Sequence, residues 1–200
     1  MILTPEDIQQ ILKYIPRRKE IFKGFVPSAV LVIILNKSDR THLIYIRRAQ
    51  EMTLHSGQMA FPGGKIDQQD VSSRAAAVRE TREEIGIVES QFTYLGEMGF
   101  FETLISRYDA AAHVVWSAQP FKYQINKREV AEVIEIPLDI LLNQFRPDLD
   151  FDNAQELMYL NFKYQPPNTA NEINLWGLTA RITHHFLAGL VRFLDSKKHG

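Results

Sequence analysis

Residues 79–87 read RETREEIGI, and residues 61–65 upstream of them read FPGGK. A helix through the first stretch would gather Glu80, Glu83 and Glu84 on one face, because residues three and four positions apart are neighbours on a helix surface. Like charges at these spacings destabilise a helix, and here they fall in its last turn, where the helix dipole disfavours negative charge. The cluster therefore favours a bound counter-charge, and oxygen ligands on a rigid helix suit Mg²⁺ or Mn²⁺.

The residues around this cluster delimit one helix. Asp70 or Ser72 can cap its start, with Asp70 the favoured cap, and Gly86 can end it in a left-handed conformation. By itself the stretch also allows an ordinary solvated helix end, held by pairs such as Arg79 with Glu83. Context from the rest of the chain is needed to choose between the two interpretations.

That context is a resemblance to the Nudix box, whose pattern is G-x5-E-x7-R-E-U-x-E-E-x-G-U with U an aliphatic residue. Residues 79–87 fit the second half, except that Thr81 replaces an aliphatic residue. One extra residue separates Gly64 from Arg79, as in the coenzyme A diphosphatase branch of the family. Residues 63–70 match the G-G-K-x-D-x-x-D pattern of that branch.

A second signature of the same branch, R-[SA]-x3-R-x3-G-[EQ]-x2-F-P-G-G, resembles residues 48–64. One position departs from it, since Thr53 stands where the pattern has its second arginine. The resemblance covers roughly residues 25–145, with a weaker echo in LWGLT at residues 175–179.

The resemblance implies a divalent-metal-dependent hydrolase that splits coenzyme A or a derivative into 3′,5′-ADP and 4′-phosphopantetheine. ADP-ribose or another nucleoside diphosphate linked to a second moiety is the alternative substrate. A non-catalytic, nucleotide-binding regulatory module stays open as a different class, although such modules usually lose box carboxylates and this chain keeps all three. Action on capped RNA is disfavoured by the lack of a basic patch interleaved with aromatic residues.

Carboxylates carry the expected chemistry. The predicted metal ligands are Glu80, Glu83 and Glu84, and the last two are also the predicted catalytic residues. Glu129, before a strand, is the predicted general base, in a loop where the family often places one. Three other acidic residues compete for that role: Glu102, Glu132 and Glu135.

Substrate contacts are expected just before and within the Gly-Gly turn. The predicted substrate-binding residues are Arg48, His55, Gly63, Gly64 and Lys65. Arg47 and Arg48 would point to opposite faces of a strand, so only one of them can contact the substrate phosphate. Arg79 and Asp70 are predicted to support the site structurally, with Arg79 orienting Glu83 through charge-assisted bonds.

Bulk composition limits the other classes of function. The chain has 200 residues, 45% hydrophobic content, no cysteine and a net charge of -1. These values predict one globular domain, no disulfide or thiolate chemistry, and no broad nucleic-acid binding. Without a long apolar run or a signal pattern we expect a cytoplasmic protein and no membrane partner. The expected partner is a small nucleoside diphosphate, and a homodimer stays open.

Periodicity predicts a mixed sheet flanked by helices, which corresponds to the Nudix-type α/β/α sandwich. The expected domain spans residues 1–200, with a core at about 25–145 and helical extensions at 1–24 and 176–197. An initial helix follows Thr4 and ends before Pro16, and Thr179 is a candidate cap for the final helix, 178–194. Strands are predicted at 26–35, 42–48, 92–101, 108–117 and 130–136, a short helix at 137–144, and a loop or short hairpin around 166–169.

Overall fold

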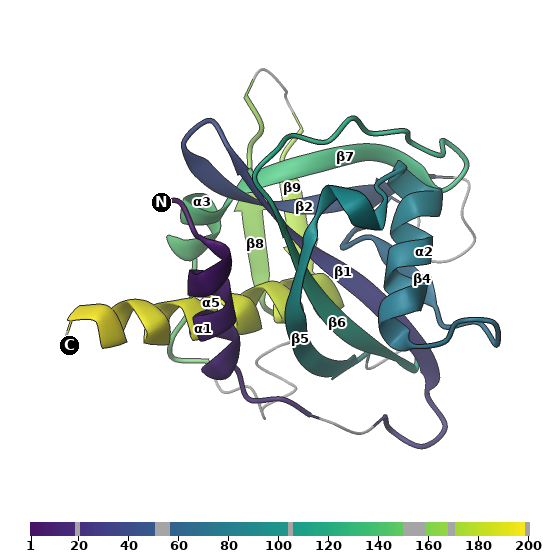
Figure 1. The fold of residues 1–200 in the computed structure, drawn as a ribbon, viewed down its shortest axis with the longest axis horizontal. Coiled ribbons are helices and arrows are strands. Elements are labelled where there is room, and N and C mark those ends of the chain that lie inside the picture. Colours follow the sequence, from purple (N-terminus) through teal and green to yellow (C-terminus); the bar gives the residue numbers. More distant parts are fainter. Residues whose placement is uncertain (19–20, 51–56, 104–105, 150–158, 168–170, 199–200) are drawn as a thin grey trace.

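The computed structural model describes residues 1–18, 21–50, 57–103, 106–149, 159–167 and 171–198. Its centre is a seven-stranded mixed sheet (Figure 1). The strands are β1 (Val26–Lys37), β2 (Arg40–Arg48), β3 (Met59–Ala60), β4 (Gly63–Lys65), β5 (Thr93–Glu102), β6 (Tyr108–Ser117) and β7 (Val130–Pro137). Their order is β3-β2-β1-β6-β5, with β4 paired to β1 and β7 paired to β2.

β1 organises the sheet, because three strands pair with it. It runs parallel to β6 and antiparallel to β2 and β4. Its first half pairs with β4, where Val30 lies opposite Gly63, and its second half pairs with β2. The Gly-Gly turn is thereby fastened to the central strand.

Helices lie on both faces of the sheet (Figure 1). α2 (Ser73–Ile85) covers one face, and α1 (Pro5–Lys13), α3 (Leu138–Leu142) and α5 (Gly177–Lys198) lie on the other. The second face also carries a two-stranded hairpin of β8 (Asn161–Tyr164) and β9 (Ile173–Trp176). A short 3₁₀ turn, η1 (Glu89–Gln91), leads into β5. The predicted mixed α/β sandwich with helices at both ends is confirmed.

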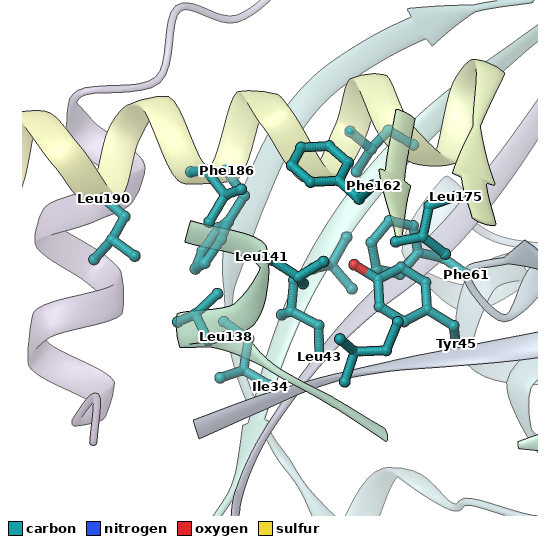
Figure 2. Packing of buried hydrophobic residues seen from close by; sticks show 14 of the residues in the cluster. Ile34, Leu43, Tyr45, Phe61, Leu138, Leu141, Phe162, Leu175, Phe186 and Leu190 are labelled. Atoms are coloured by element: carbon teal, nitrogen blue, oxygen red, sulfur yellow. The ribbon is translucent and has the colours of Figure 1, made fainter. Parts of the chain in front are cut away.

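Alternation along β1 separates two hydrophobic cores. Leu31, Ile33 and Leu35 pack under α2, whereas Val32 and Ile34 belong to the larger core on the other face. This is the two-residue period expected of a strand buried on both sides. Figure 2 shows the larger core, where side chains from β1, β2, α3, the hairpin and α5 meet.

The terminal helices pack against one another and against the sheet. α1 begins at Pro5 under a capping box between Thr4 and Asp7, as the sequence predicts. α5 begins at Gly177, so the prediction that Thr179 caps it is wrong. The Thr179 hydroxyl instead donates to the carbonyl of Met59 at 2.9 Å, which ties α5 to β3.

Within the described residues, no helix has both the length and the apolar composition needed to cross a membrane. That the whole chain forms one domain with the predicted boundaries stays a prediction.

Candidate active site

α2 carries the acidic cluster to the Gly-Gly turn. Ser72 caps the helix by accepting a hydrogen bond from the Ala75 amide at 3.1 Å, and Gly86 ends it with φ 76°. Between them, the last turns of α2 lie against β4. The amide of Gly63 donates to Oε2 of the buried Glu84 at 2.9 Å.

Glu80 lies against the second glycine of the turn. A Cβ atom added to Gly64 would be 2.5–2.6 Å from the Glu80 carboxyl group. Any larger residue at position 64 would therefore push this carboxylate away. Gly63 has another reason to be glycine, because its φ of 148° and a Cβ only 2.2 Å from the Ala29 carbonyl exclude a side chain.

Burial and neighbouring charges shift the pKa values of these carboxylates. Burial raises the pKa of Glu84 to about 8; the Gly63 amide and Arg48 oppose this shift, and the charges of Glu80 and Glu129 add to it. Burial also raises the pKa of Glu80, Arg79 opposes that shift, and Glu83 and Glu129 reinforce it. Glu80, Glu84 and Glu129 are thus close enough to repel one another when all are ionised.

Glu83 lies at the exposed edge of the cluster, where it shares Nη1 of Arg79 with Glu80. Its side chain is 52% exposed and accepts a bond from Arg79 at 3.3 Å. The three acids differ in burial, since Glu84 is buried, Glu80 is partly buried and Glu83 is exposed. At i and i+4, Glu80 and Glu84 share the inward side of α2, and Glu83 lies at its edge.

Arg79 is engaged entirely with the protein. Its guanidinium donates to both carboxylate oxygens of Asp70, at 2.9 and 3.0 Å, and to the Lys65 carbonyl at 3.2 Å. It also donates to Glu80 at 3.0 Å. This geometry is consistent with the predicted supporting role.

Asp70 is not the helix cap, so that preference was wrong. Its carboxylate holds Arg79 and accepts the amide of Asp67 at 2.8 Å, and the cap is Ser72. Arg79 lowers the pKa of Asp70 and keeps it ionised. Asp70 thus links the loop before α2 to the acidic end of the helix.

The two neighbouring arginines at the end of β2 point apart, as the sequence predicts. Arg48 places Nη1 3.9 Å from Oε1 of Glu84, whereas Arg47 donates to Glu132 at 2.5 Å. A register shift against β7 lies between them. Arg48 is therefore the arginine beside the acidic cluster.

Of the remaining predicted substrate-binding residues, the structure describes Lys65 but not His55. The Lys65 ammonium lies 5.9 Å from the centre of the Tyr108 ring, on the surface beyond the turn. His55, and Thr53 where the signature departs, lie outside the described residues.

Glu129 is the acid that the structure brings to the cluster. Its backbone carbonyl accepts the amide of Ala49 at 2.8 Å, next to Arg48. The three competing acids are bound in ion pairs elsewhere: Glu102 with Arg18 and Arg181, Glu132 with Arg47, and Glu135 with Lys37.

Sequence reasoning missed Asn126. Its backbone N–H donates to the Glu84 carbonyl at 2.9 Å, and its side-chain amide donates to the Glu129 carboxylate at 3.2 Å. It therefore joins the end of α2 to the loop that carries Glu129. An asparagine in a polar loop has no pattern that reveals a partner 42 residues away in the sequence, so nothing in the sequence could have found it.

Residues 26–158 match the NUDIX domain family. The chain belongs to the Nudix family. A probable nudix hydrolase of Schizosaccharomyces pombe is 31% identical over 160 residues, covering 80% of this chain and 54% of that protein. The uncharacterized Nudix hydrolase NudL of Pectobacterium atrosepticum is 33% identical over 160 residues, covering 78% and 79%. The chain thus spans about half the length of the yeast relative and about four fifths of the bacterial one.

Solved structures agree on the Nudix fold. A MutT/nudix family protein from Enterococcus faecalis superposes with a TM-score of 0.56 at 13% identity, over 98% of this chain and 76% of that one. The MutT protein from Methanosarcina mazei Go1 gives 0.51 at 17% identity, over 90% and 99%. These likenesses show the fold alone, and family membership confirms the predicted class of Nudix hydrolase.

Nudix hydrolases generally need a divalent metal ion, and the donor set here suits one. Among the described residues, no three acidic or histidine side chains are arranged to hold an ion as they stand. The chemistry nevertheless fits, because Glu80 and Glu84 are partly or wholly buried carboxylates whose ionisation is opposed by burial and by neighbouring acids. A hard cation would relieve both penalties.

Proposed function

We propose that the protein hydrolyses the diphosphate bond of coenzyme A or a derivative, giving 3′,5′-ADP and 4′-phosphopantetheine. The class of reaction rests on one observation: Glu80, Glu84 and Glu129 converge beside the Gly-Gly turn with Arg48 at their edge. The choice of coenzyme A rests on the signatures at residues 48–64 and 63–70, which resemble those of the coenzyme A diphosphatases.

Glu80, Glu83 and Glu84 would hold Mg²⁺ or Mn²⁺. Bound there, the ion would polarise the diphosphate and lower the pKa of the attacking water. Glu80 and Glu84 already lie together, whereas Glu83 would have to exchange its contact with Arg79 for the ion. Arg79 would keep Asp70 as its partner and so hold the loop in place during that exchange.

Glu129 would accept the proton of the attacking water. Its charge raises the pKa values of Glu80 and Glu84, and Asn126 donates to one of its carboxylate oxygens at 3.2 Å. Arg48 would contact a substrate phosphate, because it lies 3.9 Å from Glu84 and its side chain is partly exposed. Positioning and electrostatics carry such phosphorus chemistry, so no protein nucleophile is required.

A substrate panel tests this proposal. The full chain is incubated with Mg²⁺ or Mn²⁺ and with coenzyme A, dephospho-coenzyme A, ADP-ribose, a dinucleoside polyphosphate or NADH, and the products are separated. We expect the highest kcat/KM for coenzyme A or an acyl derivative. Faster hydrolysis of ADP-ribose would support diphosphate hydrolysis as the reaction but would overturn coenzyme A as the preferred substrate.

Nucleotide binding without hydrolysis of any compound would instead favour the regulatory module. Calorimetry on the same panel, without added metal and then with it, separates binding from turnover. Assembly as a homodimer stays a prediction, and sedimentation of the same sample measures it.

A further inference from the structure

The turn before β1 exposes large apolar side chains. Ile21 is 42% exposed, Phe22 46% and Val26 39%, and they follow one another within six residues. Figure 1 shows this turn projecting at the lower edge of the molecule, well away from both chain ends. We call residues 21–26 the apolar tip.

Basic residues surround the apolar tip. Lys23 belongs to it, and Arg107 is held beside it because the Val26 amide donates to the Arg107 carbonyl at 2.8 Å. Lys65 lies above Tyr108, which pairs with Val26 across the sheet. All three cations are exposed, and within the described ranges none of them makes an ion pair with an acidic side chain.

Nearby acids are already neutralised beneath the tip. Arg18 forms ion pairs with Asp109 and Glu102, and Arg181 forms another with Glu102 at 2.8 Å. Asp109 is fully buried there. Asp67, near Lys65, is paired with Arg79 at 3.5 Å, so the charges that remain around the tip among the described residues are those of the three exposed cations.

Contacts with Asp109 and Arg18 hold the apolar tip against the sheet. The amide of Phe22 donates to the buried carboxylate of Asp109 at 2.8 Å, and the Arg18 guanidinium stacks 4.1 Å from the Phe22 ring centre. Arg18 is itself tied to β5, since its carbonyl accepts the amide of Phe100 at 3.1 Å. The tip is thereby held to β5 and β6, while Ile21, Phe22 and Val26 stay partly exposed.

We propose that the apolar tip docks on an anionic phospholipid bilayer. Ile21, Phe22 and Val26 would enter the headgroup region, while Lys23, Arg107 and Lys65 contact lipid phosphates and carboxylates. A second copy of the chain fits less well, because a two-fold contact would bring these like charges against one another. The prediction of no membrane partner rested on the lack of a spanning segment, which a surface contact does not need.

Such docking would bring the candidate active site to the bilayer surface. Lys65 ends β4, which begins at Gly63 in the Gly-Gly turn. Substrates with an apolar moiety gather at bilayer surfaces, so the enzyme would meet them there. Vesicle binding is nevertheless independent of hydrolysis, and its failure would leave the proposed reaction untouched.

Vesicle sedimentation with the full chain tests the proposal. One set of vesicles contains equal parts of phosphatidylserine and phosphatidylcholine, and the other contains phosphatidylcholine alone. We expect binding to the first set that weakens with salt, and about tenfold weaker binding for Ile21→Ser. The double variant Lys23→Glu/Arg107→Glu should bind the anionic vesicles with an affinity lower by about tenfold or more.

Matched controls lie on other parts of the surface. Ile2→Ser removes an isoleucine that is 50% exposed near the N-terminus, and Lys13→Glu reverses an exposed charge on α1. Both should bind like the wild type, and all variants should hydrolyse a water-soluble substrate at the wild-type rate, which shows that they fold. Absence of wild-type binding, equal binding to neutral vesicles, or tip variants that bind normally would overturn the proposal. A smaller sedimenting species for Ile21→Ser without vesicles would assign the surface to a second copy instead.

Discussion

Gly63 and Gly64 are adjacent and are glycines for different physical reasons. Gly63 needs a backbone conformation that side chains rarely adopt, and a Cβ atom there would overlap the Ala29 carbonyl. Gly64 has no positive φ, and the three atoms nearest to its missing Cβ all belong to the Glu80 carboxyl group. The first glycine therefore serves the fold, and the second makes room for a carboxylate.

Exchanging each glycine for alanine separates these roles. Gly64→Ala should displace Glu80 and lower kcat/KM for diphosphate hydrolysis by about 10²-fold, as the loss of a few kcal/mol of transition-state stabilisation implies. Its free energy of unfolding should change little. Gly63→Ala should lower that free energy by more than about 2 kcal/mol through strain and backbone overlap. Denaturant titration and steady-state kinetics measure both, and wild-type turnover in Gly64→Ala would contradict the placement of Glu80.

Glu84 gives the metal-free protein a defined pH dependence. Its folded pKa of about 8 lies above its ordinary value of 4.5, because burial disfavours the ionised form. Between these values the unfolded chain ionises Glu84 while the folded chain keeps it protonated. The free energy of unfolding should therefore fall as pH rises from about 4.5 to 8, at up to about 1.4 kcal/mol per pH unit.

Glu84→Gln removes this titrating group and keeps a side chain of the same size. With a chelator present, the difference in unfolding free energy between variant and wild type should widen in favour of the variant across that pH range. Denaturant titrations at several pH values measure it. Parallel curves for the two proteins would show that Glu84 does not titrate as its burial implies.

The start and end of α2 show which features of a helix can be predicted from sequence patterns and which cannot. Its end at Gly86 and the presence of a cap near residue 70 were predictable, because both depend on local backbone chemistry. The choice between Asp70 and Ser72 was not, since either side chain can cap a helix and only the folded chain brings Arg79 to Asp70.

The two residues therefore respond differently to substitution. Ser72→Ala should lower the free energy of unfolding by about 1 kcal/mol, the usual cost of losing a cap, and leave turnover unchanged. Asp70→Asn should lower turnover by about tenfold or more, because Arg79 loses its charged partner and is free to compete for Glu80 and Glu83. Chemical denaturation and kinetics on both variants check this. A loss of stability in Asp70→Asn together with a loss of turnover in Ser72→Ala would contradict this account and favour Asp70 as the cap.

The hairpin of β8 and β9 was predicted only as a loop or short hairpin. Its strands have four residues each, and burial alternates as Phe162 and Tyr164 on one strand and Ile173 and Leu175 on the other. Runs this short do not distinguish a strand from an irregular segment by periodicity alone. The long strands and the final helix were predictable because their periods extend over many residues.

Across the whole molecule, the helices at the two chain ends pack together. A Cβ atom on Gly189 of α5 would lie 2.6 Å from the Ile15 side chain and 3.1 Å from the Ile11 carbonyl. This glycine lets α5 approach the N-terminal segment closely. The sequence predicted both helices, but not their contact, because partners so far apart leave no local pattern.

Filling this contact tests whether the terminal helices stabilise the whole fold. Gly189→Val should lower the free energy of unfolding by about 1–3 kcal/mol through overpacking. The control Lys197→Ala removes a surface ion pair with Asp7 between the same helices and should cost less than about 1 kcal/mol. Thermal and chemical unfolding measure both. Equal effects would indicate that the helix contact is loose.

The candidate site was predictable in its parts but not in its arrangement. The resemblance to the Nudix box identified the acids, and the helical period predicted Glu80, Glu83 and Glu84 on one side of the helix. The different burial of Glu83 and Glu84 and the approach of Glu129 required the three-dimensional course of α2 and of the loop before β7. Strand order likewise follows from long-range pairing that hydrophobic patterns do not encode.

The most direct test of the account is hydrolysis of coenzyme A with Mg²⁺ by two glutamate variants of equal size. Glu84→Gln removes a charge from the buried cluster, whereas Glu132→Gln removes one that is paired with Arg47 outside it. We predict that kcat/KM falls at least about 10²-fold in Glu84→Gln and stays near the wild-type value in Glu132→Gln. Near-wild-type turnover in Glu84→Gln, or an equal loss in both variants, would contradict the account.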